Sequence, residues 1–209
     1  MKAVFFDFDG VLTLDPTGSH SICHDVSKQS GIDLKTFSAA YRKYNRQLLY
    51  GEKMHRDIWD GLCRDLGAAI PYTLLYESFL HTPIDLDMLN LVKAIRRAGI
   101  KTGMITDNKR DRIDAIRSFY NWYSLFDAVA VSAALGSGKS NPDIFHWALH
   151  QIGAAPTDCI FIDNSAQNLV VPRAMGIHTI LYDDARRDFL ALLQALRALG
   201  VPIDEPNLP

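Results

Sequence analysis

The chain has 209 residues, of which 48% are hydrophobic, enough for one full core and a small satellite core but hardly for two ordinary domains. Its 22 basic and 24 acidic residues give a formal net charge of -2, which offers no electrostatic basis for binding nucleic acid or an anionic membrane surface. We therefore expect one domain with an insertion, and a small soluble partner in place of nucleic acid or a membrane. The expected assembly is a monomer or a homodimer.

The first apolar run points to a cytoplasmic protein. It covers residues 3–6 and is interrupted by Asp7 and Asp9, so it is too short and too charged for a signal peptide. No later stretch approaches the roughly 20 apolar residues that are needed to span a bilayer. The three cysteines are far apart and form no CxxC pair, which indicates neither a disulfide framework nor a zinc site. We expect these thiols to be reduced and mostly buried.

Five short apolar runs are typical of strands that are buried on both faces. They cover residues 3–8, 101–106, 128–132, 159–163 and 178–182. Between them lie helical patterns over 86–100, 144–152 and 166–175, two of which have a glycine near the end as a C-terminal cap. This alternation predicts βαβ units. The predicted fold class is therefore α/β, with a Rossmann-like parallel sheet flanked by helices.

The region from about residue 19 to residue 80 breaks this alternation. It contains helical segments but no convincing strand, and the segments lie at 41–50, 58–66 and 74–80. Pro16, Gly18 and Pro83 punctuate its two connections to the rest of the chain. We predict an inserted α-helical cap subdomain over residues 16–83, with residues 1–15 and 84–209 forming the α/β core.

Polar residues follow the predicted strands at their carboxyl ends, where the functional crevice of a parallel α/β sheet lies. The segments concerned are Asp7-Phe8-Asp9-Gly10, Thr106-Asp107-Asn108, Gly138-Lys139-Ser140 and Asp163-Asn164. Side chains two apart on an extended chain point the same way, so Asp7 and Asp9 can face one pocket. A single aspartate at a strand end is commonly a turn or capping residue. Capping alone does not readily explain four polar strand ends that converge.

The segments DFDGVLT, MITDN, GSGKSNPDIF and FIDNSAQN resemble the four ordered motifs of the haloacid dehalogenase superfamily. The insertion between the first and second motifs resembles the helical cap of the phosphatase-rich branch of that superfamily. This resemblance implies a hydrolase that cleaves a small phosphorylated metabolite, a phosphomonoester, through an aspartyl-phosphate. It also implies Mg²⁺ as the cofactor.

The resemblance makes Asp7 the nucleophile, and Asp9 the general acid and later the general base. An aspartate with an ordinary pKa near ~3.9 is ionised at neutral pH, so Asp7 needs no separate base. Asp9 must instead hold a proton for the leaving group and then take one from water. Two neighbouring carboxylates cannot easily both be ionised, which favours this division of labour.

A metal site is implied by the same resemblance. Two carboxylates and a substrate phosphate with a charge of about -2 need cations close by. The family pattern assigns Mg²⁺ to the side chains of Asp7 and Asp163 and to the backbone carbonyl of Asp9. Asn164 stands where a second acidic residue is usual in the fourth motif. We include Asn164 as a metal ligand without charge, and we expect weaker metal binding in consequence.

Cationic and hydrogen-bonding groups are predicted to hold the phosphate. Lys139 adds a fixed positive charge, and the resemblance gives it a role in catalysis as well as in binding. Backbone amides after the second strand can hold phosphate oxygens. The other predicted phosphate-binding residues are Gly10, Thr106, Asp107 and Asn108. In the cap, we hypothesise that at least one of Arg42 and Arg46 faces the pocket and recognises a polar or anionic substrate; the alternative is that both belong to the solvated face of a helix.

Other functions are also open. Dehalogenating members of the superfamily share the nucleophile but lack the second aspartate, so Asp9 favours phosphoryl transfer. A phosphomutase differs only in which group accepts the phosphoryl group. A catalytically weak binding or regulatory module is the alternative of another class, and Asn164 is its only hint. The segment GSGKS also suggests a nucleotide-binding loop, but Ala133 stands where that pattern needs its first glycine, and Pro142 favours a helix that begins after the lysine.

Overall fold

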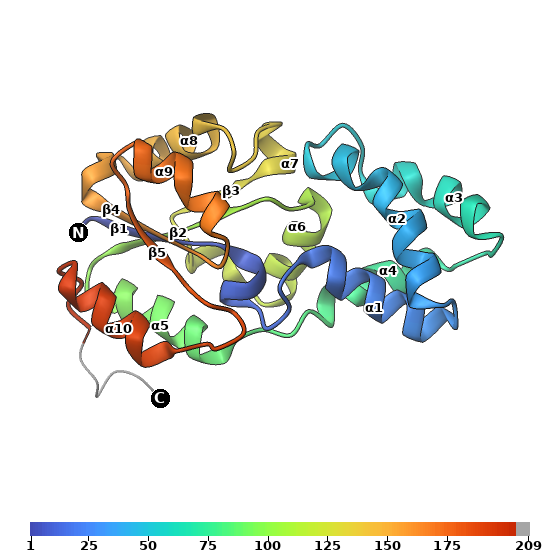
Figure 1. The fold of residues 1–209 in the computed structure, drawn as a ribbon, viewed down its shortest axis with the longest axis horizontal. Coiled ribbons are helices and arrows are strands. Elements are labelled where there is room, and N and C mark those ends of the chain that lie inside the picture. Colours follow the sequence, from blue (N-terminus) through green and yellow to red (C-terminus); the bar gives the residue numbers. More distant parts are fainter. Residues whose placement is uncertain (204–209) are drawn as a thin grey trace.

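A computed structural model of the chain describes residues 1–203. Five parallel strands form one sheet in the order β3-β2-β1-β4-β5, as Figure 1 shows. The strands span Ala3–Phe6 (β1), Lys101–Thr106 (β2), Ala128–Val131 (β3), Cys159–Asp163 (β4) and His178–Leu181 (β5). The predicted α/β fold with a parallel sheet is confirmed.

Ten α-helices connect and cover the strands in the described part of the chain. They span Gly18–Ser30 (α1), Leu34–Leu49 (α2), His55–Leu66 (α3), Tyr72–Leu80 (α4), Leu86–Arg97 (α5), Arg110–Phe119 (α6), Ser132–Leu135 (α7), Pro142–Ile152 (α8), Val170–Ala174 (α9) and Phe189–Ala198 (α10). None of the helices in residues 1–203 is long and apolar enough to cross a membrane.

The sheet separates two cores because successive side chains of a strand point to opposite faces. Val4 and Phe6 of β1 belong to one cluster, which also includes apolar residues of α5 and α10. Ala3 and Phe5 belong to a second cluster, which includes residues of α8. Figure 1 accordingly shows α5 and α10 on one side of the sheet and α8 and α9 on the other. Both faces of β1 are therefore buried, as its continuous apolar sequence predicts.

The strand register brings the ends of three neighbouring strands to the same level. Phe6 at the end of β1 pairs with Met104 of β2 and with Ile162 of β4. The next amide, that of Asp7, still donates to the carbonyl of Ile162 at 2.8 Å. The first predicted strand is two residues too long, because the chain turns over Phe8–Leu12 as soon as it has passed Asp7.

The segment between β1 and α5 is helical throughout its ordered elements, as predicted. Helices α1 to α4 lie together at one end of the molecule, away from the sheet (Figure 1). An antiparallel bridge between Thr13 and Ile84 joins the two connections to this helical insertion. The division into a core and a cap stays a prediction, and its residues 204–209 lie outside the described part of the chain.

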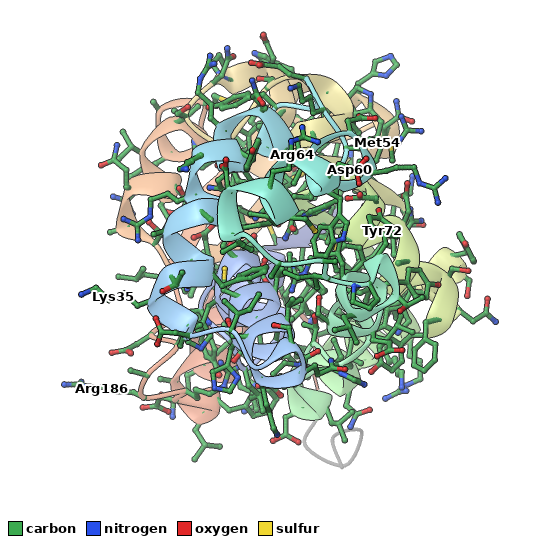
Figure 2. The ribbon with its side chains drawn as sticks, turned by 90° about the vertical axis from the view of Figure 1, so that its right-hand side faces the viewer. Lys35, Met54, Asp60, Arg64, Tyr72 and Arg186 are labelled. Carbon is green, nitrogen blue, oxygen red and sulfur yellow. The ribbon has the colours of Figure 1, made fainter. Side chains whose placement is uncertain are left out.

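The outer face of the helical insertion is solvated. Viewed from that end (Figure 2), the charged side chains of Lys35, Asp60 and Arg64 belong to its helices, and all three are exposed. Helix α2, which contains Arg42, has one side that faces water and another that packs against α1 and α3. Phe37 and Tyr41 mark the buried side of α2.

Helices α1, α6, α7 and α10 are absent from the predicted elements, and α2 begins seven residues before the predicted start. Helix α1 buries Ser21 and Ser27 beside its few apolar residues, and α6 buries Arg112. Because polar residues occupy part of the buried face, neither sequence displays a clear apolar stripe. Helix α10 does have apolar periodicity, so polar residues on a buried face do not explain why it is absent from the predicted elements.

Candidate active site

A cavity of about 600 Å³ lies at the carboxyl ends of β1, β2 and β4, between the sheet and the helical insertion. Several of the residues predicted for the site line it: Asp7, Asp9, Thr106, Asp107, Lys139 and Asn164. Thr17, Gly18, Ser19, Asn45 and Leu49 close it from the insertion and its first connection. The structure thus brings most of the predicted residues to one cavity, although they come from four separate parts of the sequence.

Lys139 holds two of the predicted carboxylates together. Its Nζ lies 2.8 Å from Oδ2 of Asp7 and 2.7 Å from Oδ2 of Asp163. All three side chains are almost completely buried, and Asp163 has no exposed surface. The two carboxylates from neighbouring strand ends therefore converge on one cationic group.

Burial changes the acid–base behaviour of this group. It raises the pKa of Asp7 to about 7, because desolvation and the neighbouring Asp163 together outweigh the positive charge of Lys139. The pKa of Lys139 is raised in spite of its burial, because Asp7 and Asp163 favour its charged form. The ordinary aspartate pKa assumed from the sequence is therefore wrong for Asp7. Its ionised form depends on the cations around it.

Asp163 is fixed by two further donors beyond the strand. The amide of Ser165 donates to its Oδ1 at 2.7 Å, and Nδ2 of Asn168 lies 3.1 and 3.2 Å from its two carboxylate oxygens. Asn168 is not among the predicted site residues, although it closes the motif FIDNSAQN. Its position in the turn that follows a strand-end aspartate is the signal that could have identified it.

Asp9 is held by a buried arginine that the sequence analysis does not identify. Arg112 donates from Nη1 to Oδ2 and from Nη2 to Oδ1 of Asp9, both at 2.9 Å, and it has no exposed surface. Nδ2 of Asn108 adds a third donor at 2.6 Å from Oδ2. Three donors match an ionised carboxylate, which only accepts hydrogen bonds. In this state both oxygens of Asp9 are occupied as hydrogen-bond acceptors.

Gly10 and Asn164 fit against each other at the turn after β1. Gly10 has a φ of 78°, and a Cβ there would lie 2.2 Å from Nδ2 of Asn164. The left-handed backbone therefore favours glycine, and any larger residue would also displace the amide of Asn164. The side chain of Asn164 lies over this turn and lines the cavity, beside the predicted metal ligands.

The three polar residues of the second motif make different contacts. Thr106 is buried at the end of β2 and lines the cavity, and its hydroxyl oxygen accepts from Nδ2 of Asn108 at 3.3 Å. Asp107 accepts the backbone amide of Lys139 at 2.8 Å and so positions the loop that carries this lysine. The backbone amide of Asn108, a predicted phosphate donor, already donates to Oγ of Ser132 at 3.0 Å. In this state Asn108 contributes to the site through its side chain, which donates to Asp9.

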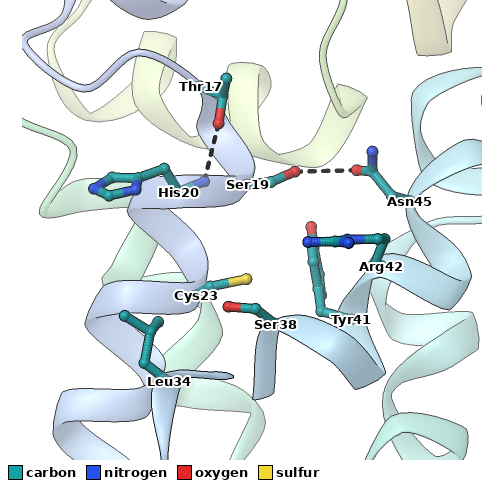
Figure 3. Close-up of a pocket in the computed structure, with 9 residues that line it drawn as sticks. All are labelled: Thr17, Ser19, His20, Cys23, Leu34, Ser38, Tyr41, Arg42 and Asn45. Atoms are coloured by element: carbon teal, nitrogen blue, oxygen red, sulfur yellow. Dashed lines mark hydrogen bonds between the residues drawn. The ribbon is translucent and has the colours of Figure 1, made fainter. Parts of the chain in front are cut away.

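The two arginines predicted for the cap are in different environments. Arg42 lines a second cavity of about 260 Å³ between α1 and α2, and Figure 3 shows its side chain extending from α2 into that cavity. Thr17, Ser19 and Asn45 line both cavities, so the two adjoin. Arg46 lines neither, and its Nη1 pairs with Glu52 at 3.3 Å on the exposed surface. Of the two, only Arg42 is placed to meet a substrate.

Contacts between the helical insertion and α6 hold the insertion over the site. Nδ1 of His55 lies 2.8 Å from Oδ1 of Asp111, and its Nε2 lies 2.7 Å from the hydroxyl of Tyr41. Burial lowers the pKa of His55, although the Asp111 carboxylate opposes this shift. Because both ring nitrogens are occupied, His55 serves as a buried connector between the insertion and α6, with no face free for a ligand.

The donor set suits Mg²⁺ better than a metal that needs many side chains. Within residues 1–203 no three His, Cys, Asp or Glu side chains are grouped so as to hold a metal. Mg²⁺ commonly takes one or two carboxylates and fills its other positions with water and phosphate oxygens. Two buried carboxylates that already share a cation, beside the backbone of Asp9, fit this requirement.

The fold and the cavity define an α/β protein with a buried acidic site at the carboxyl edge of its sheet. A family model for haloacid dehalogenase-like hydrolases matches residues 1–176, and the chain belongs to this family. The family predicted from the four motifs is therefore confirmed.

Similar proteins agree with this assignment. Acyl-CoA dehydrogenase family member 10 of Mus musculus is 27% identical over 98% of this chain, which spans only 20% of that protein. A phosphatase of Mycobacterium tuberculosis is 24% identical, with 98% of this chain and 97% of that protein aligned. Among solved structures, a haloacid dehalogenase family enzyme of Bacteroides thetaiotaomicron, determined as a magnesium complex, has a TM-score of 0.70 at 18% identity. That comparison covers 93% of this chain and 98% of the other.

Proposed function

We propose that the chain is a magnesium-dependent phosphatase that hydrolyses a small phosphomonoester through an aspartyl-phosphate on Asp7. The observation that carries this proposal is the meeting of Asp7 and Asp163 at Nζ of Lys139, with Asp9 lining the same cavity. The aligned phosphatase of Mycobacterium tuberculosis and the magnesium complex of the structural neighbour support it.

Asp7 is the proposed nucleophile. A carboxylate oxygen of Asp7 forms the bond to phosphorus while the ester oxygen of the substrate leaves. Oδ1 of Asp7 accepts the amide of Phe8 at 2.7 Å, and its Oδ2 contacts Lys139, so the group is oriented before substrate arrives. In the second half of the reaction, a water oxygen bonds to phosphorus, the bond to Asp7 breaks, and phosphate leaves.

Asp9 is the proposed acid and base. In the first step the departing ester oxygen takes a proton from Asp9, and in the second step Asp9 takes a proton from the attacking water. Arg112 and Asn108 orient the carboxylate of Asp9 through three donors, and the second role requires this ionised form. The first role needs one Asp9 oxygen to exchange a donor for a proton when substrate binds.

Mg²⁺ would be held by the carboxylates of Asp7 and Asp163 and by the backbone carbonyl of Asp9. When bound, the ion supplies positive charge between these carboxylates and the substrate phosphate. Lys139 remains beside both carboxylates and can pair with a phosphate oxygen. Thr106 offers its hydroxyl to the same phosphate from the end of β2.

A phosphate-release screen over a panel of metabolite phosphomonoesters tests the proposal. We expect release from at least one substrate in the presence of Mg²⁺ and its loss after chelation, because the buried carboxylates and the phosphate repel one another without the ion. Restoring Mg²⁺ should restore the rate. Release that is equally fast in excess chelator would contradict the metal-dependent mechanism.

Replacing Asn164 by aspartate should tighten Mg²⁺ binding. The side chain of Asn164 lines the cavity beside the turn that carries Asp9, and a carboxylate there would add one negative charge to the site. Affinity of oxygen-ligand sites rises with ligand charge, so we expect the half-saturating Mg²⁺ concentration to fall by about tenfold. The measurement is a Mg²⁺ titration of phosphate release. Asn141→Asp, at the exposed start of α8, serves as the control and should leave the titration unchanged.

The alternatives have less support from the site. A nucleotide-binding loop at GSGKS is disfavoured because Lys139 pairs with Asp7 and Asp163, and because α8 begins only at Pro142. A dehalogenase has no need for the second aspartate that Arg112 holds in the cavity. A phosphomutase would use the same groups, and the screen separates it from a phosphatase because it transfers the phosphoryl group without releasing phosphate.

A further inference from the structure

Lys109 is a buried cation at the boundary between the active-site cavity and the helical insertion. It directly precedes α6, its exposed fraction is 3%, and it lines the larger cavity. Its Nζ donates to Oγ of Ser19 in α1 at 2.8 Å and lies 5.8 Å from the centre of the Tyr41 ring. The phosphatase mechanism proposed above makes no use of it.

Lys109 differs from the other buried cations of the site in having no carboxylate partner. Lys139 contacts Asp7 and Asp163, and Arg112 contacts Asp9. Within residues 1–203 no carboxylate lies within ion-pair distance of Nζ of Lys109, and the hydroxyl of Ser19 is its hydrogen-bond partner. A buried charge without a counter-ion is costly, so the arrangement calls for an anion that the chain itself does not provide.

The electrostatic surroundings agree with this geometry. Burial lowers the pKa of Lys109 to about 8, and the positive charge of Arg112 adds to the effect, while the more distant carboxylates of Asp9 and Asp111 oppose it without cancelling it. At neutral pH the group is still mostly protonated. An anion that entered the cavity would offset both the desolvation and the repulsion by Arg112.

The position of Lys109 relative to Asp7 indicates that this anion belongs to the substrate. Lys109 and Asp7 line the same cavity, but Lys109 contacts the insertion through Ser19, whereas Asp7 lies at the sheet edge. Ser19 also donates to Asn45 at 3.1 Å, as Figure 3 shows, and both of these residues line the adjoining cavity that contains Arg42. A substrate with its phosphate at Asp7 would extend its remaining part toward these groups.

We propose that Lys109 is a specificity-determining residue that binds a second anionic group, a carboxylate or a second phosphate, on the leaving part of the substrate. The proposal rests on the proposed phosphatase function and narrows its substrate class. Ser19 positions the ammonium group, and Arg42 is the second cation that a longer substrate can reach. The preferred substrates are therefore phosphomonoesters that carry another negative charge.

Two matched substrate pairs test the proposal. In the first pair, 3-phosphoglycerate has a carboxylate where glycerol 3-phosphate has a hydroxymethyl group. In the second pair, fructose 1,6-bisphosphate has a second phosphate that fructose 6-phosphate lacks. We expect the wild-type protein to prefer the doubly anionic member of at least one pair. Lys109→Met should lower the ratio of the two kcat/KM values by about 10- to 100-fold, mainly through KM, because a charge-assisted hydrogen bond is lost. The pair with the larger loss tells whether a carboxylate or a phosphate is bound.

The controls separate this role from a structural one. Lys93→Met, at an exposed position on α5, should leave the ratio unchanged. Lys109→Arg, which keeps the charge, should retain part of the preference. If Lys109→Met does not fold, Ser19→Ala should still lower the ratio, by a smaller factor.

An unchanged ratio in folded Lys109→Met, or a wild-type protein that does not distinguish the two members of either pair, would overturn the proposal. Absence of phosphate release from all substrates would instead count against the phosphatase function.

Discussion

Asp7→Asn is expected to abolish phosphate release, with kcat falling by about 10⁴-fold or more, as when other enzymes lose their nucleophile. The amide oxygen of asparagine is a poor nucleophile, and the change also removes one of the two negative charges proposed to hold Mg²⁺. Lys139 keeps its contact with Asp163 at 2.7 Å, so the loop that carries this lysine retains a partner.

The fold should survive this change. Asp7 is buried and its pKa is raised to about 7, so its charge is costly in the folded protein and a neutral group of the same shape is tolerated there. We expect thermal unfolding of Asp7→Asn close to that of the wild type. Mass spectrometry of acid-quenched reactions should detect a phosphoryl adduct on the wild type and none on the variant.

A matched control is available at the opposite end of the sheet. Asp158 precedes β4, and its side chain is 42% exposed and pairs with Lys2. Asp158→Asn should therefore leave phosphate release unchanged. If Asp7→Asn turns over substrate at the rate of the wild type, Asp7 is not the nucleophile.

Arg112→Met is expected to damage both stability and activity. The change leaves the buried carboxylate of Asp9 with Asn108 as its remaining donor, and breaking a buried ion pair on one side typically costs about 3–5 kcal/mol of unfolding free energy. Phosphate release should fall on the order of 10²-fold, the lower range of general acid–base contributions, because Asp9 loses its orientation. Urea unfolding and the dependence of kcat on pH measure the two effects.

A second substitution distinguishes an ion pair from simple packing. Arg112→Met combined with Asp9→Asn removes both charges, so the double variant should recover part of the lost stability but none of the activity. Arg110→Met, an exposed neighbour on the same helix, should change stability by no more than about 0.5 kcal/mol. If the double variant is no more stable than Arg112→Met, the unpaired Asp9 charge is not the cause of the loss.

The sequence predicts the parts of the site that depend on local sequence patterns. Asp7 and Asp163 each end a continuous apolar run, and parallel strand ends meet at one edge, so their convergence follows from the strand assignments. Thr106 and Lys139 are identified in the same way, by their place after a strand or in a motif. Helices with polar residues on their buried side, such as α1 and α6, escape prediction because their sequences resemble solvated segments.

Long-range partners could not be predicted. Arg112 lies 103 residues from Asp9, and Lys109 lies 90 residues from Ser19. In sequence both belong to the charged segment KRDR, which has the composition of a wet helix face. Arg46 and Arg42 are four residues apart on α2, yet one lines a cavity and the other pairs with Glu52 in solvent.

By itself the sequence determined the α/β fold, the family and the acidic strand ends, because strand periodicity and short motifs are encoded by neighbouring residues. Only the tertiary structure decided which cations meet which carboxylates, and which lysine is left without one. Those contacts depend on how α6, the loop that carries Lys139 and the helical insertion pack at the carboxyl edge of the sheet. Burial in that interface also sets the pKa of Asp7 and of Lys109, since desolvation is a property of the folded surroundings and not of the residue.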